Sequence, residues 1–236
     1  MNITIDDKKE DLIISIHQPA YLPWLGYFDK LMRGDIFVFL DNVQFEKNSF
    51  INRNKIKTPQ GAIWLTVPAK LKGHLGKTIK ETGIDNSKDW QKNHLSTIFF
   101  NYKKARNFSV LYPELEKLYA KEYGNMSDLC YDQLLFWLDW LGIKKEIINA
   151  SELGLTSEKS DLVLEICGKL GATKYISGTL GRDYLESGKF KSAGIEIEFQ
   201  EYNQPVYEQL WGEYIPNLSI LDYAMNNGKN DLILNK

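Results

Sequence analysis

Short apolar runs and amphipathic stretches alternate near the start of the chain. Residues 12–16 are a continuous apolar run rich in β-branched side chains, which predicts a strand covered on both faces. Residues 24–33 carry apolar side chains at helical spacing, and Gly34 ends this pattern. Residues 36–40 return to the strand pattern. We therefore expect a right-handed strand–helix–strand unit with parallel strands.

The middle of the chain follows two other patterns. Residues 49–57 and 62–68 flank a turn at 58–61, which predicts a β-hairpin. Helical periodicity, with many aromatic residues, then runs from about residue 89 to 141. We expect residues 87–143 to form a helical insertion or subdomain.

A second series of strands and helices follows. Strands are predicted at 146–149, 174–177 and 195–199, with a helix at 159–170 between the first two. No internal repeat or Pro-rich linker separates the two series. The predicted fold is α/β, a mostly parallel, Rossmann-like doubly wound sheet with a β-hairpin and an inserted helical subdomain. We expect one discontinuous domain over residues 1–236.

Charge and composition narrow the classes of function. The chain of 236 residues has 29 basic and 31 acidic side chains and a formal net charge of −2, which favours no nucleic-acid partner. The first apolar run is too short for a signal peptide or a membrane span, so we expect a cytoplasmic protein without membrane insertion. No metal site is expected, because the histidines and cysteines show no metal-ligand spacing. These residues are His17, His74, His94, Cys130 and Cys167.

The segment after the first predicted strand is the best candidate for an active site. Ligands of doubly wound sheets bind beyond the carboxyl ends of the strands, where residues 17–28 combine a histidine, an amide, two prolines and several aromatic rings. Prolines stiffen a loop and so help to hold reactive groups in fixed positions. The alternative for the aromatic residues is a place in the core. We predict catalytic roles for His17 and Gln18 and substrate-binding roles for Tyr21, Trp24 and Tyr27.

Polar residues in and before the hairpin form a second cluster. Arg53 carries a planar guanidinium suited to carboxylate or phosphate, and Asp41 directly follows the second predicted strand. The alternative is an exposed strand with a solvated face. The substrate-binding residues predicted here are Asp41, Asn52, Arg53, Asn54 and Lys55.

A third cluster follows the strand predicted at 174–177. Two glycines, two hydroxyl groups and an arginine after a strand suit an anion, because backbone N–H groups can face the ligand there. Glycine-containing turns also follow strands in proteins that bind nothing at that place. The substrate-binding residues predicted here are Ser177, Gly178, Thr179, Arg182 and Tyr184.

The motif Ile-His-Gln-Pro-Ala-Tyr-Leu-Pro-Trp-Leu-Gly-Tyr-Phe at residues 16–28 resembles the opening signature of the WbqC-like family. Three later stretches support the resemblance: residues 53–56 together with 64–68, residues 175–178 and residues 217–222. Membership would imply a bacterial protein from a gene cluster for O-antigen or another surface polysaccharide. The chain is less similar to nucleotidyltransferases and ATP-using ligases, since Gly26-Tyr27 stands where those enzymes carry Gly-His.

The resemblance implies a role in surface-polysaccharide biosynthesis, including that of lipopolysaccharide O-antigen, and together with the candidate site residues it leads us to expect a transferase. It would move an acyl or aminoacyl-type group to an amino sugar, with a nucleotide sugar as small-molecule substrate. His17 would be the general base, Gln18 would orient the substrate, and Arg53 or Arg182 would hold phosphate or carboxylate. ATP and an acyl donor are the candidate cosubstrates, and the oligomeric state is left open. The alternatives are an ATP-dependent ligase or nucleotidyltransferase-like enzyme, and a non-catalytic sugar-binding or scaffolding protein.

Overall fold

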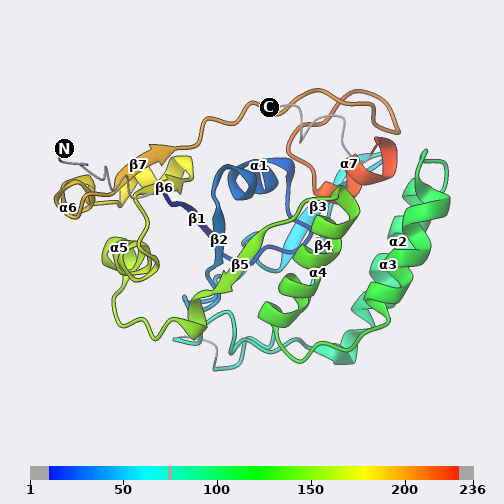
Figure 1. The fold of residues 1–236 in the computed structure, drawn as a ribbon. Coiled ribbons are helices and arrows are strands. Elements are labelled where there is room, and N and C mark those ends of the chain that lie inside the picture. Colours follow the sequence, from blue (N-terminus) through cyan, green and yellow to red (C-terminus); the bar gives the residue numbers. More distant parts are fainter. Residues whose placement is uncertain (1–10, 74–75, 229–236) are drawn as a thin grey trace.

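A five-stranded parallel sheet forms the centre of the molecule (Figure 1). The computed structural model describes residues 11–73 and 76–228, so His74 lies outside the described residues. The sheet has the order β5-β2-β1-β6-β7, and every neighbouring pair is parallel. The predicted α/β class and Rossmann-like doubly wound sheet are confirmed. The strands are β1 (Ile13–His17), β2 (Ile36–Phe39), β5 (Glu146–Asn149), β6 (Lys174–Ser177) and β7 (Glu196–Phe199).

The order of the strands creates a switch point between β1 and β6. The chain passes from β1 outward through β2 to β5, then crosses back to β6 on the other side of β1 and continues to β7. In sheets of this kind the connections after the two central strands leave in opposite directions, which opens a crevice at their carboxyl ends. The carboxyl end of β1 is His17, one residue later than the sequence pattern predicts.

Alternating side chains of the strands build a core on each face of the sheet. Ile14 and Ile16 of β1 and Val38 of β2 belong to the core beneath α5 (Lys159–Leu170) and α6 (Ser187–Ser192). Phe37 and Phe39 belong to the larger core on the side of α1 (Leu25–Arg33). Since His17 pairs in register with Phe39, its side chain faces α1.

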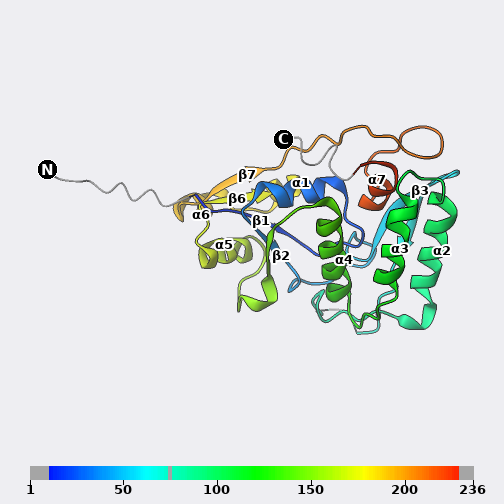
Figure 2. The ribbon, with the colours of Figure 1, turned by 45° about the vertical axis from the view of Figure 1, so that its right-hand side comes forward.

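The hairpin and three helices pack beyond the edge of the sheet (Figures 1 and 2). The larger core joins α1, the hairpin and these helices. The helix α4 begins where the Asn125 side chain accepts the Asp128 N–H at 2.8 Å, and it ends at Gly142 in the left-handed conformation. The division into one domain with an inserted subdomain stays a prediction. The elements are β3 (Arg53–Thr58), β4 (Gly61–Thr66), α2 (Trp90–Tyr102), α3 (Phe108–Tyr119) and α4 (Met126–Leu141).

A C-terminal helix that the sequence pattern does not predict, α7 (Ile220–Asn226), closes the larger core. Its buried Asp222 accepts hydrogen bonds from the hydroxyls of Tyr102 at 2.7 Å and Tyr207 at 3.0 Å. The Tyr102 hydroxyl also accepts the backbone N–H of Lys57 at 2.8 Å. These bonds tie α7 and the long connection before it to α2 and β3.

Two further findings apply to residues 11–73 and 76–228. None of the helices there combines the length and the apolar character needed to cross a membrane. No group of three or more His, Cys, Asp or Glu side chains is arranged there to hold a metal ion. Cys130 and Cys167 are free and buried.

Candidate functional site

His17 lies at the switch point, and only one of its two ring nitrogens makes a hydrogen bond to a described residue. Its Nδ1 lies 2.9 Å from the backbone oxygen of Gln18, an acceptor, so Nδ1 carries the proton and donates it. Nε2 has no hydrogen bond to any described residue. The ring packs against Tyr27 at 4.6 Å and against Trp24 at 5.5 Å between ring centroids. Burial, with the nearby charge of Lys30 as a second cause, lowers the pKa of His17 to about 3. His17 is therefore neutral near neutral pH, and its Nε2 lone pair is not used by any described residue.

Lys30 reaches the same edge of the sheet from α1. Its side chain is only 5% exposed. A Cβ added to Gly178 would lie 3.8 Å from the Lys30 Nζ atom and would meet no other group within 4 Å. Burial lowers the pKa of Lys30 to about 7. A titrating amine and a neutral imidazole thus lie near each other at this edge of the sheet.

The turn after β6 forms the opposite wall. Ser177 is buried and ends β6, and a short 3₁₀ helix, η3 (Thr179–Asp183), follows Gly178. A Cβ on Gly181 would lie 2.0 Å from the Ser177 Oγ atom, so only glycine lets the turn fold back onto Ser177. Thr179 and Tyr184, at the two ends of the turn, are exposed.

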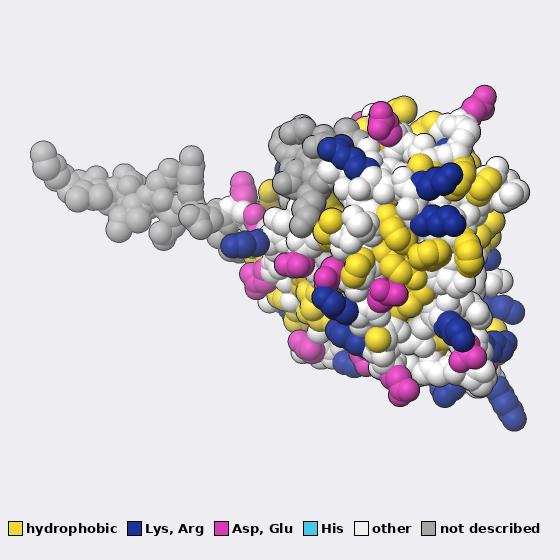
Figure 3. All heavy atoms as spheres, turned by 90° about the vertical axis from the view of Figure 1, so that its right-hand side faces the viewer, with side chains coloured by type: hydrophobic (Ala, Val, Ile, Leu, Met, Phe, Trp, Pro, Cys, Tyr) yellow, Lys and Arg dark blue, Asp and Glu magenta, His cyan; other side chains and the backbone are white. Residues whose placement is uncertain are grey.

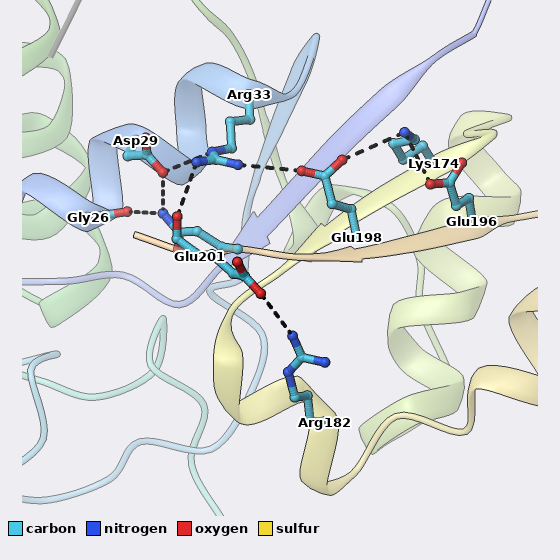
Figure 4. A network of polar contacts seen from close by, with 9 residues as sticks. Gly26, Asp29, Arg33, Lys174, Arg182, Glu196, Glu198 and Glu201 are labelled. Atoms are coloured by element: carbon cyan, nitrogen blue, oxygen red, sulfur yellow. Dashed lines mark hydrogen bonds and ion pairs between the residues drawn. The ribbon is translucent and has the colours of Figure 1, made fainter. Parts of the chain in front are cut away.

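Arg182 of η3 faces β7 and not the interior of the crevice. Its guanidinium stacks on Phe199, 4.3 Å from the ring centroid, and lies 3.9 Å from the Glu201 carboxylate. Figure 4 shows this pair beside a longer network that joins α1 to β7. In that network Arg33 contacts Asp29 at 2.9 Å and Glu198 at 3.4 Å. Arg182 is itself mostly exposed, so its contact with Glu201 is weak and easily exchanged.

A row of rings connects His17 with the hairpin. From Trp24 the row continues to Phe50 at 5.1 Å and from Phe50 to Trp64 at 5.9 Å between centroids. The Arg53 guanidinium lies 4.2 Å from the Trp64 centroid, and the Lys55 ammonium 4.9 Å. Phe50 and Trp64 are 45% and 39% exposed, so the row ends in a surface of flat rings and cations. Such a surface suits a sugar ring or a nucleobase.

Four of the predicted residues have side chains that serve contacts inside the protein. The Tyr21 hydroxyl bonds to His94 Nδ1 at 2.7 Å and to the Tyr119 hydroxyl at 2.5 Å, and the residue is fully buried. Asn54 donates to the oxygen of Leu22, and Asn52 donates to the oxygen of Val67. Asp41 accepts the backbone N–H of Ser151 at 2.8 Å and its hydroxyl at 2.7 Å. Most of the other predicted residues lie at the carboxyl ends of β1 and β6 or on the row of rings beside them, whereas Tyr27 is 1% exposed and packs against the His17 ring from within the core. The residues at these two places are His17, Gln18, Trp24, Arg53, Lys55, Ser177, Gly178, Thr179, Arg182 and Tyr184.

Another hollow lies away from these residues. A groove of about 620 Å³ runs between α2 and α3, with Leu95, Phe99, Phe100 and Tyr112 among its lining. Figure 3 shows apolar side chains gathered on this face of the molecule. None of the predicted site residues lines it.

Lys30, Phe50 and Trp64 lie at or beside the candidate site but are not predicted from the sequence pattern. Every residue from Leu25 to Leu31 is buried, whether apolar or polar. The helical periodicity of the sequence therefore does not show which face of α1 carries Lys30. A signal was present, because Lys30 follows Tyr27 by three residues and shares its side of the helix. Trp64 lies directly opposite Lys55 in the hairpin, a pairing that the predicted turn implies.

Comparison with known proteins gives two matches. The model of the WbqC-like protein family matches residues 18–233. A protein of Mycobacterium tuberculosis described as "Uncharacterized protein Rv1507c" is 36% identical over 217 residues, which cover 91% of this chain and 94% of that protein. No solved structure matches the chain.

Proposed function

The chain belongs to the WbqC-like protein family, and on this premise we propose that it is an enzyme of bacterial surface-polysaccharide assembly. It transfers an acyl or aminoacyl-type group to the amine of a nucleotide-linked amino sugar. The polysaccharide setting is what the family resemblance implies. The chemistry is argued from the crevice at the carboxyl ends of β1 and β6.

The observation that carries the proposal is the state of His17. Its Nδ1–H is held by the backbone oxygen of Gln18, and Nε2 is left as an acceptor at the switch point of the sheet. A fixed, neutral imidazole with one free nitrogen is the arrangement that a general base requires. Its low pKa makes His17 a weak base without a bound anion nearby. Burial is the larger cause of this low pKa, and an anionic substrate that offsets the charge of Lys30 would remove the second cause and raise the pKa of His17 by that smaller part.

In the proposed reaction His17 carries one proton from the attacking amine to the leaving thiolate, so atoms and protons balance. The amine nitrogen of the sugar attacks the carbonyl carbon of an acyl thioester while Nε2 accepts a proton from that nitrogen. The carbon–nitrogen bond forms and the carbon–sulfur bond breaks. The imidazolium then returns the proton to the leaving thiolate, and the products are an amide and a free thiol. Gln18, next to the base, orients the reacting groups.

The rings and cations at the rim support a substrate with a planar or sugar part. Trp64 and Phe50 present partly exposed rings, and Arg53 and Lys55 lie over Trp64. A nucleobase or sugar ring stacked there would gain about 1–3 kcal/mol, a contribution typical of base–aromatic stacking.

Nucleotidyl transfer is the second candidate function, and the strand order favours it. A parallel sheet with the order β5-β2-β1-β6-β7 binds nucleotides at the point where the order reverses. Gly178 and Gly181 lie in the turn at that point. An enzyme of this class would release pyrophosphate from a nucleoside triphosphate, and acyl thioesters would not be consumed.

One assay separates these functions. The purified protein is incubated with a panel of nucleotide-linked amino sugars and either acetyl-coenzyme A or ATP with glycine, and products are identified by mass spectrometry. The proposal predicts a sugar product heavier by one acyl or aminoacyl group. Pyrophosphate release with a nucleoside triphosphate, and no acylated product, would favour nucleotidyl transfer instead. Binding of nucleotide sugars without any product would favour a non-catalytic role.

A further inference from the structure

Lys30 is a buried cation with no counter-charge in the described part of the chain. It is 5% exposed, and burial alone accounts for its lowered pKa, with no contribution from a carboxylate of the described residues. A buried ammonium without a partner is costly, and its pKa falls to limit that cost. Retaining a lysine there is explained if a ligand completes the pair.

The geometry directs Lys30 to the switch point. Side chains on a helix lean toward its N-terminus, and the N-terminus of α1 follows the loop after β1. Strands β1 and β6 pair Ser15 with Ile176, so the same register continued by two residues sets His17 level with Gly178. A Cβ added to Gly178 would lie 3.8 Å from the Lys30 Nζ atom, at van der Waals distance, and would meet no other group within 4 Å. The ammonium therefore lies beside the glycine backbone at the ends of the two central strands.

The other charged groups nearby already have partners. On α1, Asp29 contacts Arg33, which also reaches Glu198 of β7. The Gln200 amide, at the end of β7, donates to Asp29 at 2.6 Å. The carboxylates of Asp29 on α1 and Glu198 on β7 are therefore paired with other residues in the network that Figure 4 shows.

Two further charged groups lie near the crevice. Arg182 of η3 contacts Glu201, and His17 of β1 is a neutral ring. Neither supplies a negative charge to Lys30. The charge that would neutralise Lys30 is thus external to the described chain.

We propose that Lys30 and the open backbone at Gly178 bind a phosphate group of the substrate. The inference rests on the proposed function for its substrate, a nucleotide-linked sugar with a diphosphate. It adds the residue that holds this phosphate next to His17. Phosphate is a multiply charged anion, and a buried ammonium beside a glycine gives it both a charge and room for close approach.

The test measures binding of two probes to the full chain. Sulfate, whose charge does not change between about pH 7 and pH 9, and UDP are titrated while backbone amide signals are followed by NMR near pH 7. Affinities are then measured by thermal denaturation at higher pH. The variants are Lys30→Met, Lys30→Arg, Gly178→Ala and the control Lys174→Met, and acetate is titrated beside sulfate as a singly charged anion for comparison. Lys174 lies at the opposite end of β6 and pairs with Glu196 and Glu198.

The inference predicts that both probes shift the amide signal of Gly178 in the wild type. Lys30→Met weakens the binding of sulfate and of UDP by about tenfold or more. Gly178→Ala also weakens the binding of both probes, because the added methyl group lies next to the Lys30 Nζ atom, where the anion would bind. Lys174→Met binds as the wild type does. Wild-type affinity for sulfate falls by about tenfold from pH 8 to pH 9, because only the protonated fraction of Lys30 binds. Lys30→Arg, which stays protonated, keeps its affinity over that range.

The inference is overturned if neither probe binds the wild type, or if wild type and Lys30→Met bind the probes equally well. It is also overturned if the probes bind but leave the amide signal of Gly178 unshifted. Stronger binding of acetate than of sulfate would overturn the assignment to phosphate. The two proposals fail separately. Lys30-dependent binding without an acylated product refutes acyl transfer alone, and acyl transfer with full UDP affinity in Lys30→Met refutes the phosphate site alone.

Discussion

The Nδ1 atom of His17 lies 2.9 Å from the backbone oxygen of its neighbour Gln18. Because a carbonyl oxygen only accepts, this contact decides which ring nitrogen carries the proton. The chain itself therefore fixes the tautomer, and the Nε2 lone pair is available to a ligand. Burial and the charge of Lys30 then keep the ring neutral.

The tautomer and the low pKa of His17 give the first prediction. The ring nitrogens should show the Nδ1-protonated neutral form by ¹⁵N NMR at about pH 5, well below the pKa of about 6.5 for an ordinary histidine. The folded pKa is lowered to about 3, so this residue costs stability as the pH falls from about 6.5 toward 3. Two protonated ring nitrogens at about pH 6 would contradict the account.

Lys30 gives a prediction about stability without ligand. Its pKa falls from 10.5 to about 7 on folding, so the unfolded chain binds more protons between these values. Stability contributed by this residue therefore rises with pH across that window. At pH 7 the Lys30→Met variant should have the larger free energy of unfolding, because it lacks the buried amine. Urea unfolding should show that this difference from the wild type decreases by about 2 kcal/mol between pH 7 and pH 9. Lys174→Met is the control, and an advantage that does not change with pH would count against a buried cation.

Much of the fold follows from the sequence because local patterns and long-range packing agree there. The runs at 12–16 and 36–40 are apolar on both faces, as central parallel strands require, and Gly142 ends α4 where its backbone needs the left-handed conformation. The helix α7 was not predicted. It is seven residues long, and its buried Asp222 is explained only by Tyr102 and Tyr207, which are distant in sequence.

For the candidate site, the sequence pattern predicts which loops lie near the switch point but not which of their side chains face outward there. The end of the first strand is identifiable from its pattern, so His17 and Gly178 could be named as neighbours of a switch point. Whether a polar side chain faces a ligand or the interior depends on packing between distant segments. Tyr21 is an example, since its hydroxyl meets His94 and Tyr119 from two helices of the predicted insertion.

The exposed rings of the hairpin give a prediction about binding. Trp64→Ala should weaken binding of UDP-linked sugars by about tenfold, because stacking on one aromatic side chain is worth about 1–3 kcal/mol. Trp64 is 39% exposed and packs against Phe50, Arg53 and Lys55. Its replacement should therefore lower the free energy of unfolding by about 1 kcal/mol, and binding is compared at temperatures where this variant and its control are folded. Ile63→Ala is the matched control, since Ile63 is similarly exposed on the same strand. Calorimetric titration is the measurement, and equal losses in the two variants would remove the stacking role.

The tyrosine–aspartate cluster gives a prediction about stability. Tyr102→Phe leaves the Lys57 N–H without its acceptor and removes one donor from buried Asp222. The expected cost is about 2–4 kcal/mol in the free energy of unfolding, because one of the deprived groups is a carboxylate. Tyr112→Phe is the control, since its hydroxyl makes only a long contact of 3.4 Å with the oxygen of Leu95. A cost below about 1 kcal/mol for Tyr102→Phe would show that water replaces these bonds.

The most direct test of the central claim compares two histidines. His17→Ala and His94→Ala are each assayed for urea midpoint and for acyl transfer to a nucleotide-linked amino sugar. A general base contributes about 10²–10⁴-fold, so His17→Ala should lose at least about a hundredfold in turnover and keep a midpoint close to the wild type. His94 is buried and bonded to Tyr21, so its replacement should lower stability by about 1–3 kcal/mol while the folded fraction keeps its turnover. Full turnover by a stably folded His17→Ala protein would contradict the account.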